Sequence, residues 1–181
     1  MTVHHRKPWL AVLLAGIIVL GAAAGVARAA TINILALGAS NTNGAGVSDS
    51  QAWPAQLEKM LRAKGYDAHV SVNAINGQTS AQILQRASSI PAGTQVVVFD
   101  NGGDNDRKKG LSMAETNANV AKIMAMIRAH HAVPIRAPYK SVAGAMYASA
   151  GYQADGHHLS PQSHARVAAA LVPRVLAAVH K

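Results

Sequence analysis

Four short polar segments of the sequence carry side chains that could act together on a carbonyl group. They are Gly38–Thr42, Asn76–Thr79, Gly103–Asp106 and Asp155–His158. Acyl transfer needs a nucleophile, a base, a group that orients the base, and hydrogen-bond donors for the oxyanion. In chain order the segments supply a serine, a glycine N–H, an asparagine amide and a carboxylate–histidine pair. Each segment alone is typical of a turn or a helix cap, but together they predict a nucleophilic site.

The segment Asp155-Gly156-His157-His158 contains the predicted acid–base pair. A carboxylate can hold an imidazole through its Nδ1–H, which leaves Nε2 free to take a proton from a serine. The spacing of three residues favours His158 as the base, with His157 as the alternative. A metal site built from His157, His158 and His164 is a further alternative. We expect no metal there, because such a site needs more convergent ligands and supporting groups than the sequence offers.

Predicted strands and helices separate these segments and must position them. Apolar runs and 3.6-residue periodicity indicate the elements. The strands are Thr31–Leu37, Ala68–Asn73, Gln95–Phe99 and Val133–Ala137, and the helices are Ala52–Ala63, Thr79–Arg86, Ser112–His130 and one capped by Ser160 with Pro161 at its first position. This alternation indicates a parallel sheet with helices on both faces. We predict a single α/β domain, a three-layer α/β/α sandwich with a flavodoxin-like sheet that binds ligands at the carboxyl ends of its strands.

The loops and the longest internal helix give further expectations. The loops Asn43–Ser50 and Tyr139–Tyr152 are expected to form the rim of a pocket beside the four segments. Ser112 and Glu115 are expected to form a capping box at the start of the helix. The buried stripe of this helix is predicted to consist of Met113, Val120, Ile123, Met124 and Ile127.

The four segments resemble the four sequence blocks of the SGNH/GDSL hydrolase family, which is lipase- and esterase-like and includes bacterial arylesterases and lysophospholipase–thioesterases. The resemblance extends over the whole chain from the first strand onward. It implies that Ser40 is the nucleophile and that Asp155 and His158 complete a catalytic triad. It also implies that an oxyanion hole is formed by the N–H of Ser40, the N–H of Gly77 and the side chain of Asn105. No metal or cofactor is implied.

Two departures from the family pattern stand out. The family usually has Asp before the nucleophile, giving GDS, whereas this chain has Ala39. The missing carboxylate is not the triad acid, so the mechanism is expected to survive. The stretch between Asn105 and His158 is also short beside many relatives, which predicts an open site.

The resemblance implies a serine esterase that hydrolyses carboxylic esters of small molecules through an acyl-enzyme. Two other functions stay open. One is a carbohydrate O-acetylesterase, and the other is a catalytically impaired binding module that keeps the SGNH fold. The sequence does not distinguish an esterase from a thioesterase.

The N-terminus has the order of features found in a secretory signal peptide. A basic start at His4–Lys7 precedes an apolar run, Trp9–Val26, and the small-x-small motif Ala27-Arg28-Ala29. We therefore predict a signal peptide over residues 1–29, a hydrolase domain over 30–181, and export to the periplasm or the medium without stable membrane insertion. The alternative is an uncleaved helix that tethers the domain, since the apolar run is nearly long enough to span a bilayer.

Composition limits the other classes of partner. The formal net charge is +9 and falls to +6 after the predicted cleavage. No nucleic-acid-binding motif accompanies this charge, and the run Arg107–Lys109 is too short to indicate one. The absence of cysteine excludes disulfides and thiol catalysis. The sequence leaves the oligomeric state open.

Overall fold

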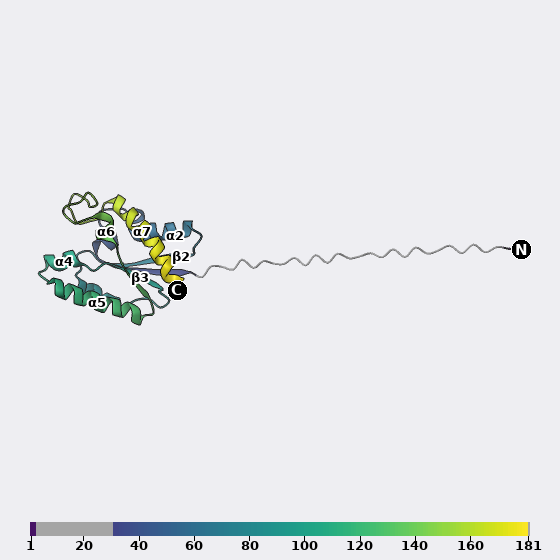
Figure 1. Cartoon of the computed structure of the whole chain (residues 1–181), viewed down its shortest axis with the longest axis horizontal. Helices are drawn as coiled ribbons and strands as arrows, with labels where there is room; N and C mark the ends of the chain where they lie inside the picture. The colour runs from purple at the N-terminus through teal and green to yellow at the C-terminus, as the bar shows by residue number, and fades with distance from the viewer. Residues whose placement is uncertain (3–30, 181) are drawn as a thin grey trace.

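The structure, a computed structural model, describes residues 1–2 and 31–180 (Figure 1). The basic start, apolar run and cleavage motif of the predicted signal peptide lie outside the described residues. Among the helices that are described, none has the length and apolar composition needed to cross a bilayer.

A parallel sheet of four strands forms the centre of the domain. The strands are β1 (Ile32–Gly38), β2 (Ala68–Ala74), β3 (Val96–Phe99) and β4 (Val133–Arg136). Their order across the sheet is β2-β1-β3-β4, and every neighbouring pair is parallel. The predicted flavodoxin-like order is therefore confirmed. All four residues of β3 are buried, as expected for an inner strand covered on both faces.

Helices cover both faces of the sheet, so the predicted α/β/α sandwich is confirmed (Figure 1). One layer contains α2 (Trp53–Ala63), α6 (Tyr139–Ala143) and α7 (Pro161–Val179), and the other contains α3 (Ser80–Ala87), α4 (Gly103–Lys108) and α5 (Met113–Ala129). Side chains alternate along β1 between the two layers. Ile34 and Ala36 join the core beside α2 and α7, whereas Leu35 and Leu37 join the core beside α3 and α5.

Four short helical segments were not expected from the sequence. They are α1 (Ser40–Asn43), the 3₁₀ turn η1 (Asp49–Gln51), α4 and α6. Helices of four to six residues are marginal on their own and show no useful periodicity. The residues before α1, α4 and α6 also provide no side-chain cap. Tertiary contacts at the carboxyl edge of the sheet must therefore stabilise them.

The helix α5 confirms its predicted start but not its whole buried stripe. Ser112 and Glu115 form the expected capping box. Ile123 and Ile127 are fully buried, and Val120 and Met124 are partly buried. Met113 is 79% exposed, so that prediction was wrong. The first inward-facing residue is instead Thr116, which bonds Asp106, while Met113 lies at the helix start, before the packed turns.

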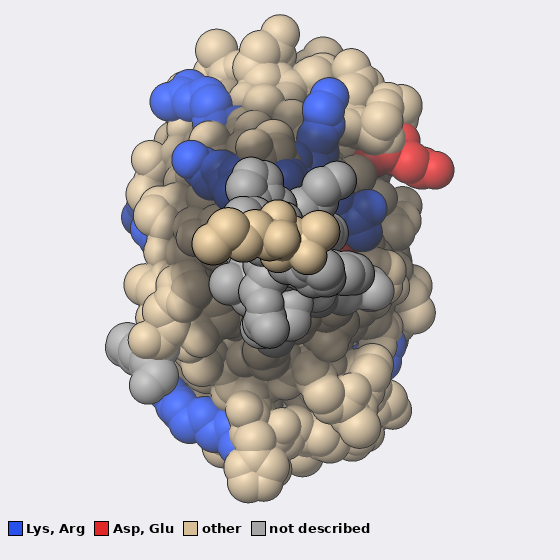
Figure 2. Space-filling view, turned by 90° about the vertical axis from the view of Figure 1, so that its right-hand side faces the viewer, with Lys and Arg blue, Asp and Glu red and all other residues tan. Residues whose placement is uncertain are grey.

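Basic side chains predominate at the end of the domain that carries the C-terminal end of α7. Figure 2 shows this end, and several Lys and Arg side chains there outnumber the acidic ones. This distribution fits the net charge of +9.

Candidate active site

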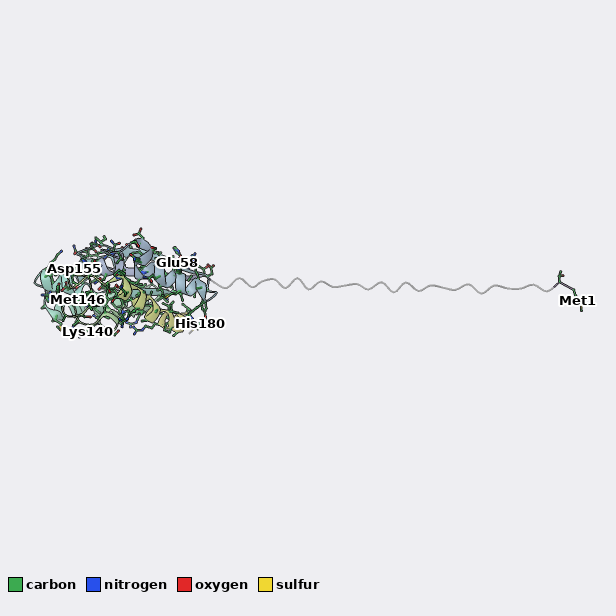
Figure 3. All side chains as sticks on the ribbon, turned by 90° about the horizontal axis from the view of Figure 1, so that it is seen from above. Met1, Glu58, Lys140, Met146, Asp155 and His180 are labelled. Carbon is green, nitrogen blue, oxygen red and sulfur yellow. The ribbon has the colours of Figure 1, made fainter. Side chains whose placement is uncertain are left out.

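A cavity of about 940 Å³ opens at the carboxyl edge of the sheet. Its wall includes Ser40 from the end of β1, Asn105 from α4 and His157 from the loop before α7. Lys140 and Met146, which also line the cavity, lie with Asp155 at one end of the molecule (Figure 3). The cavity therefore lies at the edge of the sheet where the sequence predicts ligand binding.

The lining tests the expected pocket rim. The segment from Tyr139 to Tyr152 contributes to the cavity, as predicted. The loop Asn43–Ser50 does not line it, so that expectation was wrong. This loop instead runs through α1 and η1 toward α2, because Ser40 begins a short helix and does not enter an open loop.

Ser40 is the first residue of α1 and follows β1 almost directly. Its side chain is half-buried and faces the cavity. Gly38 allows this tight exit from the strand, since a Cβ added there would lie 2.8 Å from the Cβ of Asp100 and would also meet the Thr42 hydroxyl. The nucleophile candidate is therefore fixed by the packing of β1 against β3.

Asp155 and His158, which the sequence suggests as an acid–base pair, are joined by a hydrogen bond. The Nδ1 of His158 lies 2.6 Å from Oδ2 of Asp155, and the N–H groups of His157 and His158 both donate to Oδ1 at 3.0 Å. Burial acts to raise the pKa of Asp155, but these hydrogen bonds outweigh it and lower that pKa well below the ordinary value. An ionised carboxylate only accepts hydrogen bonds, so the proton must be on Nδ1, which leaves Nε2 as a base.

The neighbouring histidine is held differently. The Nδ1 of His157 lies 3.1 Å from the backbone oxygen of Asp155 and 3.5 Å from Oδ1 of its carboxylate. Its ring packs between those of Tyr147 and His158, with centroids 5.8 and 4.1 Å away. His157 lines the cavity and His158 does not. The Asp155 carboxylate nevertheless lies closer to the ring of His158 than to that of His157.

Asp155, His157 and His158 also form a group that could hold a metal ion. The ligand atoms of Asp155, His157 and His158 lie within 4.8 Å of one another. His164 is not a member, because it is fully buried and accepts the N–H of Trp53 at its Nδ1. The alternative cluster of His157, His158 and His164 is therefore not assembled. The observed trio coincides with the acid–base pair already described.

Asn41, the residue after the nucleophile candidate, connects β1 to the histidine loop. Its Nδ2 donates to the backbone oxygen of His157 at 2.9 Å, and its Oδ1 accepts the N–H of Leu159 at 2.7 Å. The two bonds enclose His158 on both sides. Asn41 is 6% exposed, so this link is shielded from water. It holds the backbone of His158 beside the turn that carries Ser40.

Gln153 adds a second link between the same regions. Its Nε2 donates to the backbone oxygens of Ala45 and Leu159, both at 2.9 Å. The N–H of Gln153 also donates to the oxygen of His158 at 2.7 Å. The loop before α7 is therefore anchored at two places, to Asn41 in α1 and to Ala45 just after it.

Gly77 lies at the tip of an exposed turn after β2. Its φ of +75° explains why a glycine occupies this position. It does not belong to the wall of the cavity. The turn is tied to β1 by Arg86, whose guanidinium donates to the oxygen of Gly38 at 2.7 Å and to Oε1 of Gln78 at 2.7 Å. Burial lowers the pKa of Arg86.

Asn105 lies in the first turn of α4 and lines the cavity. Its Nδ2 donates to the backbone oxygen of Gln78 at 2.9 Å, which connects it to the turn carrying Gly77. The next residue, Asp106, is fully buried and accepts hydrogen bonds from the N–H of Ser80 at 2.7 Å and the hydroxyl of Thr116 at 2.6 Å. Asp106 thus anchors the turn that presents Asn105.

Asp104 joins α4 to the loop on the opposite side of the cavity. Its carboxylate accepts the hydroxyl of Tyr147 at 3.0 Å and pairs with Arg107 and Lys108, each at 2.9 Å. Burial acts to raise the pKa of Asp104, but these partners lower it overall. Tyr147 is held at a φ of +61°, which is unusual for a residue with a side chain.

Three positioning residues were missed by the sequence reasoning, namely Asn41, Gln153 and Arg86. Only Asn41 offered a local signal, since an asparagine directly follows the nucleophile candidate. The bonds of Gln153 and Arg86 reach residues up to 108 and 48 positions away in the chain. A motif search along the chain does not detect such links.

Comparisons with known proteins agree with the fold. Over 107 residues the chain is 36% identical to Esterase TesA of Pseudomonas aeruginosa, covering 58% of this chain and 53% of that protein. The chain thus spans about half the length of this curated relative. A crystal structure of TesA, at 27% identity, matches with a TM-score of 0.69 over 81% of this chain and 99% of that chain.

A third similarity concerns the fold alone. The psychrotrophic esterase EstA from Pseudoalteromonas sp. has a TM-score of 0.68 at 16% identity, covering 82% of this chain and 99% of that chain.

Residues 36–178 match the GDSL-like Lipase/Acylhydrolase family, so most of the described fold lies within the match. The chain therefore belongs to the GDSL-like lipase/acylhydrolase family.

Proposed function

We propose that the protein is an exported serine esterase that hydrolyses carboxylic esters of small molecules with the triad Ser40, His158 and Asp155. The observation that carries this proposal is the pair of hydrogen bonds from the Asn41 side chain to the backbone on either side of His158. It joins the residue next to the nucleophile candidate to the residues next to the base. The Asp155 carboxylate then orients His158 from its other side.

In the proposed reaction, Ser40 attacks the ester carbonyl while Nε2 of His158 takes its proton. The tetrahedral oxyanion is stabilised by the N–H of Ser40, the N–H of Gly77 and the side-chain amide of Asn105. His158 then donates the proton to the leaving alcohol, and Asp155 stabilises the imidazolium in the meantime. Water activated by His158 hydrolyses the acyl-enzyme, which restores the free hydroxyl of Ser40.

The cavity supports a substrate with an apolar group of moderate size. Phe99, Ala137, Pro138 and Met146 contribute apolar surface to its wall. A volume of about 940 Å³ is in the upper part of the range found for small-molecule sites. Acyl or aryl esters fit this description better than long glycans, which need stacking platforms of several aromatic rings.

The experiment is a panel of p-nitrophenyl esters of increasing acyl length, assayed with the exported protein, Ser40→Ala and the control Ser89→Ala. Ser89 is exposed and lies in the turn after α3. We expect Ser40→Ala to abolish hydrolysis, with a loss of at least about 10⁴-fold, and Ser89→Ala to keep full activity. Hydrolysis by Ser40→Ala at the wild-type rate would falsify the mechanism.

A fluorophosphonate probe distinguishes the esterase from a binding module that keeps the fold. We expect the probe to modify Ser40, as read by peptide mass spectrometry.

The mass of the exported protein tests the proposed cleavage of the signal peptide separately. A chain beginning at Ala30 supports cleavage, and retention of residues 1–29 supports a tethered form.

A further inference from the structure

Asp100, a carboxylate outside the proposed triad, lies at the carboxyl end of β3 between the nucleophile turn and α4. It directly follows Phe99, the last residue of the strand, and its N–H donates to the oxygen of Leu37 at 2.9 Å. Its side chain is only partly exposed and forms part of the cavity wall. A carboxylate held out of water at a site is a candidate for a functional role.

Asp100 contacts two of the proposed catalytic blocks. Oδ1 accepts the N–H of Gly102, the residue that caps α4, at 3.1 Å. Asp100 also packs against the turn that carries Ser40, since a Cβ added at Gly38 would lie 2.8 Å from the Cβ of Asp100, and the backbone of Ala39 acts to lower the pKa of the carboxylate. One side chain thus connects the start of the nucleophile turn to the start of the helix that carries Asn105.

This arrangement bears on the absent aspartate of the GDS motif. The methyl group of Ala39 is 2% exposed and packs in the core beside α3 and α5. Asp100 instead approaches the backbone of Ala39 from the other face, where Arg136, Tyr139 and Tyr152 are its charged and titratable neighbours. The nucleophile turn therefore keeps a carboxylate contact, but from β3.

We propose that Asp100 is a positioning residue that sets the distance between Ser40 and Asn105, because it packs against the turn at Gly38 and holds the N–H of Gly102. The proposal rests on the catalytic roles proposed above for Ser40 and Asn105. An error of about 1 Å in such a distance can reduce a rate about 100-fold. Because the effect acts on the reacting geometry, kcat is affected and KM is not.

The environment of Asp100 separates this role from a stabilising one. Burial raises the pKa of Asp100, and the N–H groups of Gly102 and Ala39 together with Arg136 oppose the shift only in part. A raised pKa in the folded state means that the ionised carboxylate disfavours folding, so stability falls as the pH rises through that pKa. Replacing Asp100 by a neutral isostere should therefore leave the thermal stability at neutral pH unchanged or increase it.

The test compares Asp100→Asn with wild type, Ser40→Ala and the matched control Asp67→Asn, which lies beside the amino end of β2. Asparagine is neutral and has one acceptor oxygen where aspartate has two, so it cannot interact with the backbone of Gly102, Ala39 and Asn101 as the carboxylate does. For Asp100→Asn we expect kcat on p-nitrophenyl esters to fall about 10- to 100-fold, with KM within about threefold of wild type and Tm equal or higher. Asp67→Asn should match wild type in kcat and KM.

Three results would overturn the proposal. They are an unchanged kcat, a raised KM at constant kcat, which would indicate direct substrate contact, and a variant that fails to fold, which would indicate a structural role. Failure of the proposed esterase function gives a different pattern, because the wild-type protein itself would then lack activity and fluorophosphonate labelling at Ser40.

Discussion

The turn that carries Ser40 and the loop that carries His158 are held in place by different means. The turn is built into the sheet, and the residues after the nucleophile, Asn41 and Thr42, are 6% and 0% exposed. In the loop, the side chains of Asp155 and His158 are 37% and 24% exposed, and local hydrogen bonds define their geometry. Packing therefore fixes the proposed nucleophile, whereas short-range polar bonds and a few anchors fix the proposed base.

This difference leads to distinct expectations for substitutions in the two regions. Changes in the packed turn should affect both stability and activity, because the same contacts serve both. Changes at the tip of the exposed loop should affect activity with little effect on folding. The following predictions test this division.

The largest effect is expected at the base. His158→Ala should reduce kcat/KM by about 10³- to 10⁴-fold or more, because its Nδ1 makes the 2.6 Å bond to the Asp155 carboxylate. His157→Ala is the matched control and should cost less than about tenfold, since its Nδ1 lies 3.5 Å from that carboxylate and bonds the backbone oxygen of Asp155. Both variants should keep the wild-type Tm within a few degrees. A larger loss in His157→Ala would assign the base to that residue.

The next effect is expected at the oxyanion. Asn105→Ala should lower kcat by about 100- to 1000-fold through loss of one donor. Its control is Asn117→Ala, at an exposed position of α5. Steady-state kinetics on one p-nitrophenyl ester measures both. Equal activity in the two variants would remove Asn105 from the oxyanion hole.

Smaller effects, on both stability and activity, are expected at Asn41, which links the two regions. Asn41→Ala breaks two buried hydrogen bonds and should destabilise the fold by about 1 to 3 kcal/mol. It should also reduce kcat about 10- to 100-fold, because the backbone around His158 is released. Asn43→Ala removes only an exposed bond to Asn76 and serves as the control. Chemical denaturation and kinetics report the two effects, and a stable Asn41→Ala with full activity would contradict the role given to this link.

The last effect concerns stability in the packed region. Burial lowers the pKa of His164 to about 4. Between about pH 6.5 and 4 the unfolded chain therefore binds a proton that the folded chain does not. The free energy of unfolding should decrease as the pH is lowered through this window. The loss should reach at most about 3 kcal/mol.

His164→Asn removes the titrating ring but keeps an acceptor for the N–H of Trp53, which bonds Nδ1 in the native protein. Urea denaturation at several pH values should show a flatter dependence for this variant, and its activity at neutral pH should resemble that of wild type. A pH slope as steep as that of wild type would assign the acid sensitivity to other groups.

The sequence predicted the strands and long helices well because their signals are local. The β-branched run before Phe99 indicated an inner strand, and Ser112 with Glu115 marked the start of α5. The short helices α1, α4 and α6 escaped prediction because they have neither length nor caps. The sequence also did not predict that Met113 is exposed, because periodicity does not show where a helix extends beyond its packing partners.

The sequence by itself determined which chemical groups are available and in which order they leave the sheet. Ser40, Gly77, Asn105 and the pair Asp155 and His158 were named from residue types, spacing and family resemblance. Parallel strands bring their carboxyl ends to one edge, so their approximate meeting place followed as well.

Only the tertiary structure decided how these groups are held. It placed the two hydrogen bonds of the Asn41 side chain on either side of His158, and it placed Asp100 against the turn that carries Ser40. These contacts join residues far apart in the chain, and their geometry depends on the packing of whole elements. No local pattern encodes it, because the partner of each donor is set by where the other strands end.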